Sequence, residues 1–229
     1  SPIPILWQDE HYVTVHKPAG LLVHRSSIAK DVRDVLMQRL RDQLHKRIYL
    51  IHRLDRPTSG VILIGLSSES ARKAVGLFEA REIEKEYLAI IRGHLSEDLR
   101  VDHALQEEPG KPEQEAVTSF TSLNTAELPI AVGRYPSARY GLVMAQPKTG
   151  RTHQIRKHLK HLSHPIIGDT TYGDGRQNRA IREHLKLHRM MLHAHKLRFP
   201  HPYTGRPITV EAPLEGDFQA MMSALDWKL

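Results

Sequence analysis

Residues 52–66 read HRLDRPTSGVILIGL, and the rest of the fold prediction is built outward from this stretch. It contains a single carboxylate, Asp55, followed two positions later by Pro57. A proline restricts the residue before it to extended geometry, so this part of the stretch is predicted to be a loop and not a helix. Residues 48–51 and 61–66 are apolar and β-branched enough to be strands. The pattern predicts a stiff loop between two buried strands.

The charges of this loop allow two interpretations. Asp55 lies between Arg53 and Arg56, and nearby cations lower the pKa of a carboxyl and keep it ionised, as a nucleophile or an electrostatic stabiliser requires. The alternative is a surface turn whose aspartate bonds its own backbone and pairs with an arginine in solvent. The spacing alone favours neither interpretation, so the remainder of the chain has to decide.

Composition narrows the class of protein. The chain has 229 residues, with 40% hydrophobic and 26% charged residues, which is typical of a globular protein with a real core. The net charge is +7 before any of the 16 histidines is protonated, which favours anionic partners and nucleic acid first. There is no cysteine, which excludes thiolate chemistry and fits a reducing compartment. No apolar run approaches the roughly 20 residues that span a bilayer.

Apolar periodicity predicts strands and helices that mix along the whole chain. Further strands are predicted at 3–8, 12–16, 84–93, 116–123, 140–146, 190–199 and 207–212, and helices at 32–44, 69–81, 152–162, 176–187 and 216–227. Asp31 is the predicted N-cap of the first helix, and Ser67 or Ser68 that of the second. KPAG at 17–20 is predicted to be a turn, and the acidic segment 96–115 an irregular excursion. These elements predict one α+β domain over residues 1–229, with a largely antiparallel sheet and flanking helices.

One long span of the chain carries a single sign of charge. Residues 128–168 contain no Asp or Glu, whereas they contain seven lysines and arginines and four histidines. Surfaces normally mix the two signs, so this span predicts a basic cleft for a phosphate backbone. The predicted RNA contacts within it are Lys148, Arg151, His153, Lys157 and Lys160, with Arg53 and Arg56 added from the first loop. The 148–151 turn also presents backbone N–H groups at a helix N-terminus, where anions are favoured.

The residues present in the sequence exclude most other kinds of catalytic site. His158, His161 and His164 have no carboxylate near them in the sequence, so a metal site is not predicted. No GxGxxG motif follows a strand, and no GxSxG elbow is present. A glycosidase would require two carboxylates flanking one bond. The chemistry that remains is a reaction on RNA with one carboxylate and no cofactor.

Several motifs, taken together, resemble the RluA family of pseudouridine synthases. HRLD at 52–55 resembles the catalytic loop of that family, EKEYLAIIRG at 84–93 its tyrosine strand and PKTGRTHQIRKHL at 147–159 its third motif. KPAGLLVH precedes them, and HPIIGD, LHAHKLRF, HPYTG and EAPL follow in the order of the family. The resemblance covers essentially the full chain.

The resemblance implies a role for each matching residue. Asp55 would be the catalytic aspartate that is needed to break the C1′–N1 bond of a uridine. Tyr87 would stack on the flipped uracil, and Arg156 would pair with Asp55 and keep it ionised. Arg53 would enter the RNA stack that the flipped nucleotide leaves. No cofactor and no metal is implied, because the uracil is only turned and rejoined through C5.

The resemblance also implies the partners. The substrate would be RNA, with tRNA preferred over ribosomal RNA, and the chain looks closest to members that modify uridine-65 of certain tRNAs. The alternatives are a ribosomal RNA enzyme of the same family and an RNA-binding module without catalysis. The first strand begins almost at residue 1, so no S4-like RNA-binding domain is expected before it. A monomer acting in the cytoplasm, without membrane contact, is expected.

Overall fold

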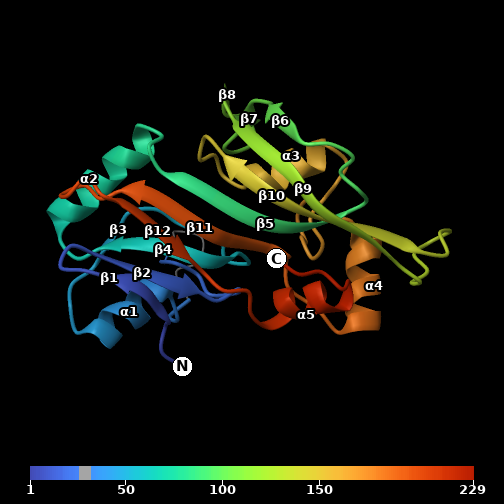
Figure 1. The fold of residues 1–229 in the computed structure, drawn as a ribbon, viewed down its shortest axis with the longest axis horizontal. Helices are drawn as coiled ribbons and strands as arrows, with labels where there is room; N and C mark the ends of the chain where they lie inside the picture. The colour runs from blue at the N-terminus through green and yellow to red at the C-terminus, as the bar shows by residue number, and fades with distance from the viewer. Residues whose placement is uncertain (26–31) are drawn as a thin grey trace. The chain divides into compact units, whose positions relative to one another are not determined.

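The computed structural model describes residues 1–25 and 32–229. They form two compact units, of which the first contains residues 1–85 and 194–213 and the second residues 86–193 and 214–229. The chain passes between the units three times: within β5 (Glu84–Arg92), within β11 (Leu192–Pro200) and between residues 213 and 214. Figure 1 labels the elements along the chain.

The first unit is built on an antiparallel sheet. β1 (Ile5–Gln8) pairs with β2 (Tyr12–Lys17), β2 pairs with β4 (Ser59–Gly65), and β11 lies next to β4 and pairs with β12 (Pro207–Glu211). The short β3 (Tyr49–Leu50) also pairs with β4. Every residue of β2 and β4 is buried, which explains why the apolar run of β4 does not alternate with polar residues. β4 therefore fixes one end of the predicted loop in the core of this unit.

Two helices complete the first unit. α2 (Ser68–Glu79) begins at Ser67, whose side chain accepts a hydrogen bond from the backbone N–H of Ser70, as the sequence predicted. α1 (Leu36–Leu44) begins four residues later than the predicted start at Val32. The reason is that Val35 is extended and bridges Leu22, so that the first N–H groups of α1 donate to carbonyls of residues 22 and 23. The predicted cap, Asp31, lies outside the described residues.

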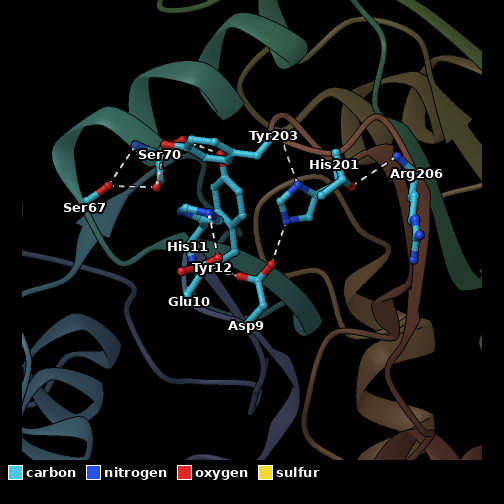
Figure 2. Close-up of polar contacts among 10 residues, drawn as sticks. Asp9, Glu10, His11, Tyr12, Ser67, Ser70, His201, Tyr203 and Arg206 are labelled. Atoms are coloured by element: carbon cyan, nitrogen blue, oxygen red, sulfur yellow. Dashed lines mark hydrogen bonds and ion pairs between the residues drawn. The ribbon is translucent and has the colours of Figure 1, made fainter.

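The HPYTG turn, residues 201–205, is tied into the first unit by a polar and aromatic cluster (Figure 2). Nε2 of His201 lies 2.6 Å from Oδ2 of Asp9, in the turn between β1 and β2. The ring of Tyr203 stacks on His11 at 3.7 Å between centroids, and its hydroxyl lies 3.1 Å from Oγ of Ser70. The cluster joins the β1–β2 turn, the first turn of α2 and the 201–205 turn.

The second unit contains a second set of antiparallel strands. β5 pairs with β10 (Ala138–Pro147), β10 with β9 (Val117–Leu128), and β9 with β6 (Leu99–Asp102). The helices are α3 (Gln154–His161), α4 (Gly175–Leu185) and α5 (Gly216–Ala224). A single apolar core joins them, and its fully buried members include Ile90, Val143, Leu159, Met191 and Phe218.

The predicted α+β class with a largely antiparallel sheet is confirmed. The prediction for residues 96–115 was wrong in part, because β6 lies there and β7 (Leu105–Gln106) pairs with β8 (Glu113–Gln114). The segment looked irregular in the sequence because β7 and β8 are only two residues long, and β8 is exposed. β9 also continues five residues beyond its predicted end. Its outer part, residues 124–128, pairs with the first residues of β10.

Candidate active site

The Asp55 loop lies between two strands, as predicted, but the strand before it, β3, is only two residues long and half-buried. It runs from β3 to β4 without helix, and the backbone N–H of Thr58 donates to the carbonyl of Asp55 at 2.9 Å, which closes a turn over Pro57. Leu54 is buried, Asp55 is half-buried and Arg53 is exposed. The loop therefore anchors itself through the leucine and presents the aspartate and the arginine at its surface.

Lys17 braces this loop from the neighbouring turn. Its side chain is fully buried, and Nζ donates to the carbonyls of Pro18 at 2.8 Å, Leu21 at 2.7 Å and Arg56 at 3.0 Å. Arg56 and Gly20 add two further bonds, since each donates to the carbonyl of the other, through Nε at 2.9 Å and the backbone N–H at 2.8 Å. A buried ammonium is tolerated when its donors meet acceptors in this way. KPAG is therefore a turn that supports the Asp55 loop.

Sequence reasoning did not single out Lys17, which looked like an ordinary residue at the start of a turn. The Lys17→Met variant keeps the length of the side chain and removes its donors. We expect it to lower the free energy of unfolding by about 1–3 kcal/mol, because the buried carbonyls lose their partner. Misplacement of the loop should also reduce turnover by roughly tenfold to a hundredfold. Urea unfolding measures the change in stability, and initial rates measure the change in turnover. The matched control is Lys46→Met, which removes an exposed lysine. If the two variants had the same stability and turnover, Lys17 would not support the Asp55 loop.

Gly60 fixes where the loop enters β4. Its φ is +125°, and a Cβ at this position would lie 2.1 Å from the carbonyl oxygen of Ala194 in β11. Only glycine fits such a backbone at such a close approach. The sequence placed Gly60 at the end of the loop, and the structure shows that the requirement comes from a strand more than a hundred residues away.

His52, at the start of the loop, is a second supporting residue that sequence reasoning missed. Its Nε2 accepts the backbone N–H of Leu63 in β4 at 2.9 Å, and its ring centroid lies 4.5 Å from that of Phe78 in α2. Burial, together with the positive charge of Lys85, lowers the pKa of His52 to about 3. The imidazole is therefore neutral at physiological pH, with the proton on Nδ1, and can act as an acceptor.

Arg156 forms a buried ion pair with a residue that the sequence analysis did not assign. Nε and Nη2 of Arg156 donate to the two carboxylate oxygens of Asp169 at 2.8 and 2.9 Å. Oδ1 of Asp169 also accepts the backbone N–H groups of Thr171 and Tyr172. Burial alone would raise the pKa of Asp169, but the bonds from Arg156 and the backbone, with the charge of Arg156, leave it lower than usual. The available signal was position, because Asp169 is the first carboxylate after the acid-free span.

The pairing of Arg156 with Asp55 stays a prediction, as do the catalytic roles of both residues. Asp55, Arg53 and Arg56 belong to the first unit, and Tyr87 and Arg156 to the second. Tyr87 lies in β5 opposite Ala145 of β10 and is half-buried.

In the folded chain, the basic span 128–168 has a carboxylate next to it that its sequence does not contain. Thr152, just before α3, donates through its backbone N–H to Oε2 of Glu107 at 3.0 Å. Arg151 donates to the side chain of Gln114 and the carbonyl of Glu115, both at 2.8 Å, and Lys157 to the carbonyl of Gln106 at 2.8 Å. The segment 105–115 thus covers part of the predicted RNA-binding cluster and supplies the carboxylate that the span lacks.

The remaining predicted RNA contacts lie around the same helix. Lys148 and Lys160 are exposed. Nδ1 of His153 lies 2.9 Å from the hydroxyl of Tyr172, and Lys160 lies 5.9 Å from the ring of Tyr172. These residues share one region of the second unit, and their contact with RNA stays a prediction.

The fold is that of pseudouridylate synthases. Human RNA Pseudouridylate Synthase Domain Containing 4 superposes with a TM-score of 0.74 at 26% sequence identity, covering 99% of this chain and 94% of that one. The profile of the RNA pseudouridylate synthase family matches residues 11–161, and the chain belongs to this family. The resemblance that the motifs suggested is therefore confirmed.

Two bacterial relatives are similar over almost the whole chain. The tRNA pseudouridine synthase C of Vibrio cholerae serotype O1 is 47% identical over 236 residues, which cover 99% of this chain and 97% of that protein. The tRNA pseudouridine synthase C of Pectobacterium carotovorum is 46% identical over 99% of this chain, which spans 63% of the length of that relative. In the part of the chain that the structure describes, no helix is long and apolar enough to cross a membrane.

Proposed function

We propose that this protein isomerises a specific uridine of tRNA to pseudouridine, and that the target is uridine-65. The observation that carries the proposal is the Asp55 loop, in which a half-buried aspartate lies on a backbone held by Lys17 and Gly60. Rigid presentation of one reactive group is what positional catalysis requires. The names of the relatives from Vibrio and Pectobacterium support tRNA as the substrate class.

The proposed reaction needs no cofactor because its atoms balance within the nucleotide. The C1′–N1 bond breaks, the uracil turns, and a C1′–C5 bond forms while the proton of C5 is lost and N1 gains one. The uridine must first leave the RNA stack, because the glycosidic bond cannot be reorganised inside a helix. Arg53, exposed on the loop, is proposed to fill the vacated place, and Tyr87 to stack on the uracil.

Asp55 is proposed to act at the bond that breaks, with Arg156 keeping its carboxylate ionised. Lys148, Arg151, His153, Lys157 and Lys160 are proposed to hold the RNA backbone together with Arg56. Arg151 and Lys157 already donate to residues 106–115, so RNA has to share or replace those bonds. The proposal includes action as a monomer in the cytoplasm, which the lack of cysteine suits.

Mapping pseudouridine in RNA from cells with and without the protein tests this function. We expect one mark to disappear, at position 65 of a subset of tRNAs, and to return when the wild-type chain is supplied. A mark lost from ribosomal RNA with tRNA intact would replace the substrate by the family alternative. No lost mark, together with retained RNA binding by the purified protein, would favour a binding module and contradict the enzyme.

A further inference from the structure

Lys85, the second residue of β5, is a half-buried lysine without an internal acceptor. In the described chain its ammonium contacts no carboxylate and no hydrogen-bond acceptor, and the nearest interaction is with the ring of Phe78, whose centroid lies 5.9 Å from Nζ. Lys17, in the same unit, is more buried, yet Nζ meets three carbonyls. The fold therefore provides acceptors for one lysine and leaves the other without them.

The charged form of Lys85 is energetically unfavourable in this environment. A covered ammonium that lacks acceptors loses hydration without compensation. Burial accordingly lowers the pKa of Lys85 to about 8, and the group is still largely charged at neutral pH. His52 is the titratable neighbour that feels this charge, and it is held neutral. An anion that arrives from outside the chain would therefore stabilise the charged form of Lys85.

The position of Lys85 in the fold indicates which anion it binds. Side chains alternate along a strand, so Lys85 and Tyr87 lie on one face of β5, about 7 Å apart. The ring of Phe78, which Lys85 approaches, also packs against His52, three residues before Asp55. Lys85 is thus next to the foot of the Asp55 loop and on the same strand face as the residue proposed to stack on uracil.

We propose that Lys85 is an anion-binding residue that receives an anionic oxygen of the flipped uridine nucleotide. The oxygen belongs either to a flanking phosphate, which is always charged, or to the uracil. The uracil gains charge on O2 and O4 if it keeps the electron pair of the broken C1′–N1 bond, and it loses this charge when C5 bonds to C1′. The inference rests on the proposed function, whose site it extends.

Kinetics of Lys85→Met and Lys85→Arg on transcribed tRNA test the proposal, with Lys228→Met as the control that removes an equal charge from an exposed position. If the oxygen is that of a phosphate, Lys85→Met should weaken RNA binding about tenfold and reduce the salt dependence by about one phosphate contact, with kcat retained. If it is that of uracil, kcat should fall about a hundredfold or more with Kd unchanged, and the alkaline loss of activity near pH 8 should disappear.

In both cases Lys85→Arg should recover much of the loss, since it restores the charge. Thermal unfolding of Lys85→Met should be unchanged or shifted upward, because the variant removes a covered charge that lacks an acceptor. Values of kcat and Kd within twofold of the wild type would overturn the proposal, and so would a clear drop in Tm, which would make Lys85 a structural residue.

A binding experiment separates this proposal from the proposed function. The ¹³Cε resonance of Lys85 in the wild-type chain is followed against pH, alone and with uridine 5′-monophosphate or uridine. We expect the titration to move to higher pH with the nucleotide, and to stay in place with uridine if the phosphate is the partner. A shift in a chain that forms no pseudouridine would refute the function and keep the anion site. No shift with either probe, in a chain whose Lys85→Met variant retains full activity, would refute the anion site alone.

Discussion

Replacement of Asp55 by Asn should abolish pseudouridine formation while the protein stays folded. Asn has the shape of Asp without the charge or the acid–base chemistry, so turnover should fall by about 10⁴-fold or more. The loop should keep its geometry, because its closing bond runs from the backbone N–H of Thr58 to the backbone carbonyl of residue 55. Leu54 and Lys17 hold the loop through groups that this change leaves intact.

Single-turnover assays on tRNA carrying a tritium label at C5 of uridine measure this effect, because isomerisation releases that hydrogen. Asp34→Asn is the matched control, since Asp34 is exposed and forms its ion pair with nearby Arg39. RNA binding by Asp55→Asn should equal that of the wild type or exceed it, because one negative charge is removed. Residual turnover above about a hundredth of the wild-type rate would show that another group carries the chemistry.

The Asp55 loop was predictable because its determinants are local. Pro57 restricts the residue before it, Gly60 ends the loop, and the apolar, β-branched run that follows is typical of a buried strand. What holds the loop in place was not predictable. The acceptors of Lys17 include a carbonyl 39 residues away, and backbone carbonyls leave no mark in a sequence. The role of Lys17 depends on which turn packs beside which loop.

The charge pattern of residues 128–168 shows a second limit of sequence reasoning. The span contains no carboxylate, but Glu107 reaches Thr152 from 45 positions away, and Asp169 pairs with Arg156 from one position beyond the span. The distance between two residues in the sequence therefore does not predict which charges lie near a given side chain in the fold. The start of α1 was shifted for a related reason, since backbone bonding to Leu22 holds Val35 extended against the helical periodicity.

The Arg156–Asp169 pair gives the second large prediction, which concerns stability as well as catalysis. Both side chains are buried, with 5% and 1% of their surfaces exposed. Loss of one partner leaves an uncompensated buried charge, so Arg156→Ala should lower the free energy of unfolding by about 3–5 kcal/mol. The lowered pKa of Asp169 gives the pair a stabilising effect that is complete above pH 3.8 and is lost as the pH falls below that value.

The Arg156→Ala variant should respond to pH differently from the wild type. Without the arginine, the effect of burial on the pKa of Asp169 is opposed only by the backbone N–H groups of Thr171 and Tyr172, so we expect the carboxyl to bind its proton more tightly in the folded variant than in the folded wild type. The destabilisation should therefore be largest near neutral pH and shrink as the solution becomes mildly acidic. Urea unfolding between pH 4 and pH 8 measures this trend, and a destabilisation independent of pH would contradict the pairing.

A double variant separates the structural task of Arg156 from its proposed catalytic one. R156M/D169N removes both buried charges, and the side-chain amide oxygen that replaces a carboxylate oxygen can still accept the backbone N–H groups of Thr171 and Tyr172. We expect the free energy of unfolding to recover most of the loss seen in Arg156→Ala, whereas turnover stays at least about a hundredfold below the wild type, because Asp55 still lacks its proposed cation. Lys160→Ala, on the same helix but exposed, should weaken RNA binding and leave kcat unchanged. If turnover returned together with stability, Arg156 would serve only to hold Asp169, and the ionisation of Asp55 would depend on a different cation.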